Sequence, residues 1–188
     1  MLYILKTDTS GVSEALNNFK EKYKLNLPKK YKEFLLKYNG GETLDTSFRL
    51  NRESSSLRLF YGLSNVEYYC NFQYLIDNKF LQEFLSQGYL PIASDSFGNT
   101  IVLGVVESNF NQIAFYDHER QKSKPLNVSF EEFIQKLKSK KKKIRTIEER
   151  IEGVQSFDAP IEVDDELISF WQEEIDKYGN REQIKVEL

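Results

Sequence analysis

The chain contains few side chains that could carry out chemistry. Asp117, His118 and Glu119 are adjacent and could supply metal ligands, but neighbouring residues of a strand point to opposite faces, and the sequence has no second histidine. His118 also lacks an evident nucleophile partner, because the single cysteine, Cys70, lies among aromatic residues and is typical of a small buried hydrophobe. We therefore predict no catalytic residues, no metal site and no need for a cofactor.

A polar connection at residues 94–99 raises the question of an ion site. Asp95, Gly98 and Asn99 could in principle hold a cation or a phosphate. A calcium loop needs alternating oxygen ligands and a closing carboxylate, and a phosphate loop usually precedes a helix, whereas this connection leads into a strand. We interpret it as a structural turn whose exposed tip could also contact a partner, which makes Asp95 and Phe97 candidate partner-binding residues.

A basic segment lies near the C-terminal third of the chain. Residues 136–145 contain seven Lys or Arg and no Asp or Glu. Lys140, Lys141, Lys142 and Lys143 are candidates for binding a polyanion such as nucleic acid or an anionic lipid surface. The segment lacks interleaved aromatic residues and precedes an acidic segment, so we favour a solvated helix face and do not expect nucleic acid as the partner.

The acidic segment at residues 146–188 has 4 basic and 13 acidic side chains. Two interpretations stay open: the carboxylates keep an accessory helix soluble, or they mimic a polyanion and occupy the basic cleft of a nuclease toxin. Aromatic residues often anchor interfaces, although Trp171 could instead dock its helix on the body of the protein. The candidate partner-binding residues here are Asp164, Asp165, Glu166, Phe170, Trp171, Glu173 and Glu174.

Two elements must organise the core. Apolar residues recur at period two in Tyr89–Val106, which predicts two strands joined by the polar turn, with part of the second strand apolar on both faces. A helix over residues 28–38 is punctuated by Pro28 at its start and by Asn39-Gly40-Gly41 as a left-handed stop.

The remaining elements follow from the same patterns. A capping box at Ser129 and Glu132 begins a helix whose apolar stripe continues to Ile151, which allows one long helix. Asp164 or Asp165 caps a final helix. Further helices are predicted from Ser10 to about Lys24 and, with a break at Asp77-Asn78, over 66–86; strands are predicted at 2–5, 43–50, 57–61 and 112–117.

Length and composition limit the protein class. The 188 residues and 22.1 kDa suit one domain or one domain plus an extension. One cysteine excludes an internal disulfide framework, the N-terminal residues lack a signal-peptide pattern, and no apolar run approaches the roughly 20 residues of a membrane span. We expect a cytoplasmic α+β protein with a largely antiparallel sheet packed with helices.

Three segments in order resemble the SUKH superfamily: LPKKYKEFLLKYNGG at 27–41, LPIASDSFGNTIVLG at 90–104 and NVSFEEFI at 127–134. The resemblance covers about residues 10–138. It implies a single SUKH-like α+β domain, which we place at 1–143. The acidic helical extension at 144–188 lies outside the resemblance and is predicted from the residue pattern alone. Ser96-Phe97 departs from the glycine or small residue that such proteins often have there.

The resemblance also implies a role in protein binding without catalysis. The superfamily includes fungal regulators of cell-wall and glucan synthesis and bacterial immunity proteins that neutralise toxins. Our leading hypothesis is an intracellular immunity protein that binds one cognate toxin. The alternatives are a regulatory scaffold in cell-wall synthesis and a polyanion-binding protein acting through Lys136–Arg145.

Overall fold

The computed structural model describes residues 1–156 and 162–188, which divide into two compact units. The first unit contains Met1–Lys141 together with Gln183–Leu188, and the second contains Lys142–Glu182. The chain thus leaves the first unit after the basic segment begins and returns to it for its last residues. Those last residues form strand β10 (Gln183–Val186), antiparallel to β1 (Leu2–Leu5), a strand that the sequence analysis did not predict.

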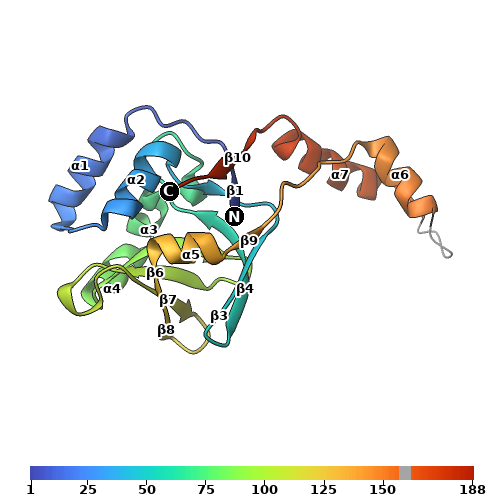
Figure 1. The fold of residues 1–188 in the computed structure, drawn as a ribbon. Helices are drawn as coiled ribbons and strands as arrows, with labels where there is room; N and C mark the ends of the chain where they lie inside the picture. Colours follow the sequence, from blue (N-terminus) through green and yellow to red (C-terminus); the bar gives the residue numbers. More distant parts are fainter. Residues whose placement is uncertain (157–161) are drawn as a thin grey trace. The chain divides into compact units, whose positions relative to one another are not determined.

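The first unit is built on a large antiparallel sheet (Figure 1). Its strands are β2 (Gly41–Glu42), β3 (Thr46–Leu50), β4 (Glu53–Phe60), β5 (Tyr89–Asp95), β6 (Thr100–Gly104), β7 (Gln112–Asp117), β8 (Lys122–Ser129) and β9 (Lys138–Ser139). The strand order is β8-β7-β6-β5-β4-β3-β9, and β2 pairs with β4 beside this path. Together with its helices, this sheet confirms the predicted α+β class. Strand β8 was not predicted, and neither was β9.

The predicted central hairpin is confirmed as β5 and β6, which pair from Tyr89 opposite Gly104 to Ser94 opposite Thr100. Val102 is fully buried although it points away from Ile101 and Leu103, so this part of β6 is apolar on both faces as expected. Val106, which follows the strand, is instead 43% exposed.

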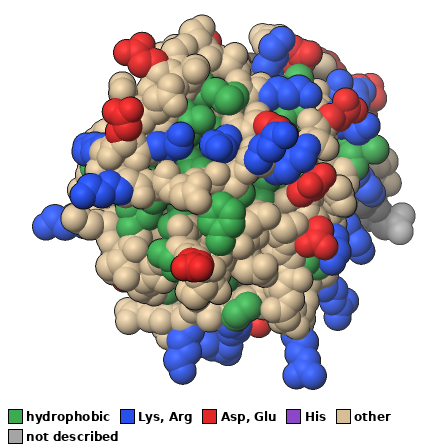
Figure 2. Space-filling model, turned by 60° about the vertical axis from the view of Figure 1, so that its left-hand side comes forward, with side chains coloured by type: hydrophobic (Ala, Val, Ile, Leu, Met, Phe, Trp, Pro, Cys, Tyr) green, Lys and Arg blue, Asp and Glu red, His purple; other side chains and the backbone are tan. Residues whose placement is uncertain are grey.

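Both signs of charge are mixed on the surface. Figure 2 shows Lys and Arg side chains interspersed with Asp, Glu and hydrophobic side chains on the face that it presents. On helix α2 (Lys29–Tyr38), for example, Glu33 lies 3.1 Å from Lys30 and 3.9 Å from Lys29. Exposed pairs of this kind contribute little to stability, so the buried core, and not these pairs, holds the fold together.

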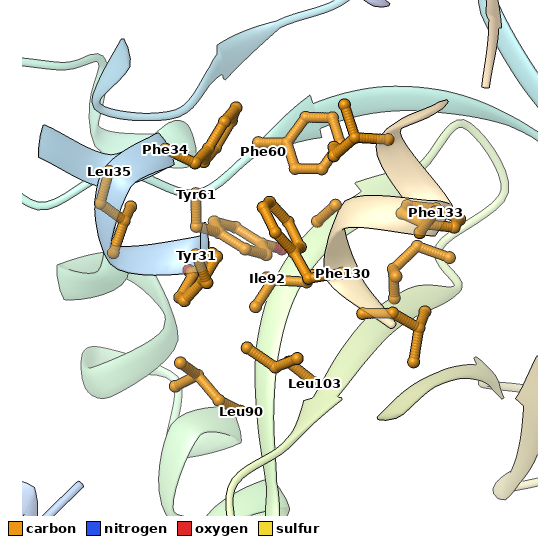
Figure 3. Close-up of a cluster of buried hydrophobic side chains, with 14 of the residues drawn as sticks. Tyr31, Phe34, Leu35, Phe60, Tyr61, Leu90, Ile92, Leu103, Phe130 and Phe133 are labelled. Atoms are coloured by element: carbon orange, nitrogen blue, oxygen red, sulfur yellow. The ribbon is translucent and has the colours of Figure 1, made fainter. Parts of the chain in front are cut away.

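Helices α2 and α5 (Phe130–Lys136) supply aromatic side chains to the core on one face of the sheet (Figure 3). The ring of Phe34 lies 5.3 Å from that of Phe60 in β4 and 5.5 Å from that of Phe130. Tyr31 meets Phe130 edge-on at 5.1 Å, and all four of these side chains are fully buried. Such tilted ring pairs add to the burial of apolar area that stabilises the unit.

The opposite face of the sheet is partly covered by α4 (Phe80–Ser86). The interrupted helix predicted over 66–86 is a 3-10 turn (Tyr68–Cys70), α3 (Phe72–Asp77) and α4 (Phe80–Ser86), with the break at Asn78 and Lys79. Phe84 of α4 packs with Val102 and Ala114 in a second, smaller cluster of buried residues. Helix α1 (Val12–Tyr23), predicted from Ser10, contacts α2 and α3, the latter through Phe19 and Phe72.

The long helix allowed by the stripe from Ser129 to Ile151 does not form. Helix α5 has the predicted capping box, but it ends at Lys136 because Leu137 is extended and buried. The next residues form β9, in which Ser139 pairs with Thr46 of β3. Burial and strand pairing therefore override the helical pattern of the lysine segment.

The second unit contains α6 (Ile147–Gln155) and α7 (Asp165–Tyr178), which contact each other. Thr146 and Glu149 form a capping box on α6, and the Asp164 carboxylate accepts a hydrogen bond from the Leu167 backbone, which confirms the predicted cap of the final helix. Neither helix contains a fully buried residue. Within the described residues, we find no helix with the length and apolar character of a membrane span.

Candidate functional site

The first unit has a hollow of about 510 Å³ over strands β4–β7, bordered by α3 and α4. Its volume lies in the range typical of specific binding sites, about 300–1,000 Å³. The wall is rich in aromatic residues, and polar and charged side chains complete it. The aromatic residues are Tyr61, Tyr69, Tyr74, Phe80, Phe84 and Tyr116, and the charged and polar ones include Arg58, Glu83, Asp95, His118 and Gln121.

Strand alternation and α4 position the deeper part of this wall. Tyr116 of β7 pairs with Thr100 of β6, and both side chains line the hollow. Phe84 meets Tyr116 edge-on with ring centres 4.8 Å apart. Burial raises the pKa of the Tyr61 hydroxyl to about 12. Tyr61 therefore stays protonated well above physiological pH, and the other residues named here, Thr100, Phe84 and Tyr116, carry no carboxylate, ammonium or guanidinium group.

The outer part of the hollow is more exposed and carries charge. Phe80, at the start of α4, is 43% exposed. The guanidinium carbon of Arg58 lies 5.4 Å from the centre of the Tyr69 ring, a cation–π arrangement that holds the arginine over the wall. Glu83 and His118 are exposed lining residues, so the rim offers both signs of charge and several hydrogen-bonding groups.

The predicted turn contributes to this hollow through Asp95. Asp95 is only 3% exposed, and its carboxylate accepts hydrogen bonds from the Phe97 amide at 2.8 Å, the Asn99 amide at 2.7 Å and the Ser55 hydroxyl at 2.5 Å. The Asn99 side chain donates a further bond at 2.8 Å. Asp95 thus builds the turn, whereas Phe97 is 66% exposed at its tip.

The residues considered for metal binding have other partners. The Nδ1 atom of His118 lies 3.0 Å from the Asn99 side-chain oxygen. Asp117 accepts a hydrogen bond from the Arg120 amide, which, with Arg120 and Lys124 nearby, lowers the pKa of its carboxyl. In the described parts of the chain, no group of three or more His, Cys, Asp or Glu side chains could hold a metal ion. Cys70 is buried.

The candidate residues of the acidic segment belong to the second unit. Asp164, Asp165 and Glu166 are exposed around the start of α7, and Glu173 is exposed further along it. Phe170 is 65% exposed. Trp171 and Glu174 are half-buried: Arg150 lies 5.9 Å from the Trp171 ring centre, and its guanidinium contacts Glu174 at 2.8 Å.

The boundary between the units divides the four candidate lysines. Lys140 and Lys141 close the main part of the first unit, whereas Lys142 and Lys143 begin the second, and all four are exposed. The backbone amide of Lys140 donates to Asp45. Lys142 and Lys143 pair with Glu174 and Glu149 at 2.8 and 2.5 Å.

The sequence analysis did not identify Arg58, Phe80 or Tyr116 as site residues. Aromatic residues at helical spacing in α3 and α4 indicate a core stripe, which is true of Phe84 but not of Phe80. A usable signal was present in β7, because alternation places Tyr116 on the face opposite the buried Phe115.

Comparison with known proteins gives one finding. A family model described as the SMI1 / KNR4 family (SUKH-1) matches residues 13–136, which is most of the first unit and includes the whole lining of the hollow. A search of curated protein sequences gives no match.

Proposed function

Because this chain belongs to the SMI1 / KNR4 family (SUKH-1), we propose that it is an intracellular, non-catalytic protein-binding module, and specifically an immunity protein that binds and neutralises one cognate bacterial toxin. The family alone does not distinguish an immunity protein from a regulator. The proposal for a protein ligand draws its support from the chemistry of the hollow in the first unit.

The observation that carries the proposal is the pairing of tyrosines with an arginine at the hollow. Tyr and Arg are enriched where protein interfaces concentrate their binding energy, and charged rims set orientation and partner choice. Arg58 over Tyr69 and the half-exposed Phe80 fit this composition. A protruding side chain or loop of the partner would enter the hollow and bury these rings.

The experiment compares two exposed phenylalanines. Phe80 lines the hollow and is 43% exposed, whereas Phe110 lies outside the lining and is 38% exposed. The tagged wild-type chain captures its partner from extract of the source cells, and the partner is then purified and titrated by calorimetry. Phe80→Ser is expected to weaken binding about tenfold or more, as for interface anchors, and Phe110→Ser to change it little.

The immunity role needs a second readout. Co-expression of the wild-type chain is expected to restore growth of cells that produce the captured toxin, and Phe80→Ser is expected to reduce this protection. A captured partner whose affinity is the same for wild type and Phe80→Ser would reject the hollow as the site. A partner without toxicity would reject the immunity role.

The second candidate is a regulatory scaffold of cell-wall synthesis, the other role found in the superfamily that the sequence resembles. This candidate predicts several weak partners in the capture experiment and no growth protection.

A further inference from the structure

The second unit contains its own hollow, of about 560 Å³, beside the contact between α6 and α7. Both helices contribute to it, together with the segment that leads into α6. Its charged and aromatic lining residues are Lys142, Lys143, Arg145, Arg150, Trp171 and Glu174. The basic run, for which the sequence analysis favoured a solvated helix face, therefore has three of its members in one concave site.

Positive charge exceeds negative charge in this hollow. Lys142 and Arg150 share one carboxylate, Glu174, at 2.8 Å each. Lys143 contacts Glu149 at 2.5 Å, while its side chain stays 75% exposed. Among the residues that the structure describes, the lining holds four cations, Lys142, Lys143, Arg145 and Arg150, and one carboxylate, Glu174, so positive charge is in excess for an anionic ligand.

The central arginine is held in place before any ligand arrives. The Arg150 side chain is 13% exposed, and its Nε donates to the Arg145 carbonyl oxygen at 3.1 Å. Its guanidinium lies 5.9 Å from the Trp171 ring centre. A fixed guanidinium beside exposed Lys143 and Arg145 gives a rigid floor and two adaptable cations, an arrangement suited to several oxygen atoms at once.

We propose that this hollow binds a small ligand that carries a diphosphate or triphosphate group. The excess charge matches such a group, and the volume suits a small molecule. A nucleic-acid strand is a poorer fit, because it would engage the whole run, whereas Lys140 and Lys141 lie outside the lining and in the other unit. The ligand could be a nucleotide or an inorganic polyphosphate, which share this chemistry.

The test uses the only tryptophan of the chain as its reporter. Trp171 lines the hollow, so the fluorescence of the full chain is recorded during titration with inorganic tripolyphosphate at constant ionic strength. A saturable change is expected, and its midpoint should rise with added salt. A titration with ATP, measured by calorimetry, distinguishes a nucleotide from an inorganic polyphosphate as the ligand. Tighter binding of ATP than of tripolyphosphate means that the protein also recognises the base or the sugar, and equal affinity means that the phosphates suffice.

Two double variants with the same loss of charge locate the site. Lys143→Gln with Arg145→Gln removes two cations of the hollow, and this pair is expected to weaken tripolyphosphate binding about tenfold or more, as for charge-assisted contacts. Lys140→Gln with Lys141→Gln removes two cations outside it and is expected to leave the affinity within about twofold, since only screened, longer-range attraction is lost. Circular dichroism checks that both variants keep the helices.

Three results would overturn the proposal. One is the absence of saturable binding at constant ionic strength. Another is equal weakening by the two double variants, which would indicate diffuse attraction to the whole basic run. The third is tighter binding of a single-stranded oligonucleotide than of both tripolyphosphate and ATP, with an affinity for the oligonucleotide that the two double variants weaken equally.

Discussion

The backbone oxygen of Asn39 lies 2.3 Å from the position that a Cβ atom on Gly62 would occupy. Two backbone segments cross here: the end of α2 and the residues that follow β4. The crossing is fixed from both sides, since Gly62 donates to the Cys70 oxygen at 2.8 Å and accepts from Phe72 at 2.9 Å. Backbone atoms of Asn39 therefore leave no room for a Cβ atom on Gly62, because a backbone cannot rotate away as a side chain can.

Gly62→Ala should consequently destabilise the first unit. The added methyl group forces the two segments apart, and we expect the free energy of unfolding to fall by about 2–3 kcal/mol, as for overpacked cores. Urea denaturation followed by circular dichroism measures this change. Gly153→Ala is the control for the same chemical change: its Cβ would meet only Arg145 at 3.4 Å, and Ala should favour α6 by about 1 kcal/mol. Wild-type stability of Gly62→Ala would contradict the crossing.

A second prediction concerns the side chain of Asn39, which is fully buried. Its amide donates to the backbone oxygens of Asp8, at 2.8 Å, and Ser64, and its oxygen accepts from the Leu63 amide at 2.8 Å. Asn39→Gly leaves these groups unpaired and should cost about 2–3 kcal/mol of stability, since each buried unpaired group is unfavourable.

Asn39→Ala distinguishes the contribution of the backbone conformation at this position from that of the side-chain hydrogen bonds. Asn39 has φ 51°, in the left-handed region, so Ala should be about 1 kcal/mol less stable there than Gly. Thermal melts of the two variants give the comparison. If Ala proved the more stable of the two, the left-handed stop of α2 would not be what selects this residue.

A third prediction distinguishes the two candidate residues of the turn. Asp95→Ala removes an acceptor of four hydrogen bonds and should lower the free energy of unfolding by about 2–3 kcal/mol. Phe97→Ser at the exposed tip should change stability by less than about 0.5 kcal/mol. Denaturation of both variants is the measurement, followed by partner titration of Phe97→Ser alone. Equal stability of the two variants would show that Asp95 does not build the turn.

The sequence predicts best the parts of the fold that local chemistry determines. The hairpin of β5 and β6, the helix between Pro28 and Asn39 and the caps at Ser129 and Asp164 each depend on residues a few positions apart. Strands β9 and β10 depend on distant partners instead. The Ser139 hydroxyl meets Thr46, 93 positions away, and Val186 pairs with Leu2, so no local pattern could indicate either strand.

The same distinction between local and distant contacts applies to the candidate sites. Asp95 could be recognised because a turn needs an acceptor near Gly98 and Asn99. The hollow in the first unit needs Arg58 from β4, Phe80 from α4 and Tyr116 from β7 together, which only the sheet order provides. In the same way, the basic run gains a distinct chemistry only when Trp171 and Glu174 of α7 are brought to Lys142.

The last prediction concerns the pH dependence of the second unit. Its helices contain no fully buried residue, so the contacts of Glu174 with Lys142 and Arg150 carry unusual weight there. Hydrogen bonds from Lys142 and then Arg150 hold the pKa of Glu174 below its ordinary value. The pKa is thus lower in the folded unit than in the unfolded chain. The pairing is fully stabilising above the unfolded value of about 4.3 and is lost as the pH falls through the folded value.

Acidification below about pH 4.3 should therefore loosen the contact between α6 and α7. Thermal melts followed by Trp171 fluorescence at neutral pH and at successively lower pH measure the effect. Glu174→Gln should be less stable at neutral pH and show a weaker pH dependence, with a residual part from Glu149, whose pKa Lys143 lowers. Glu173→Gln, the exposed neighbour, should keep the wild-type profile. An unchanged profile in Glu174→Gln would mean that this carboxylate does not hold the two helices together.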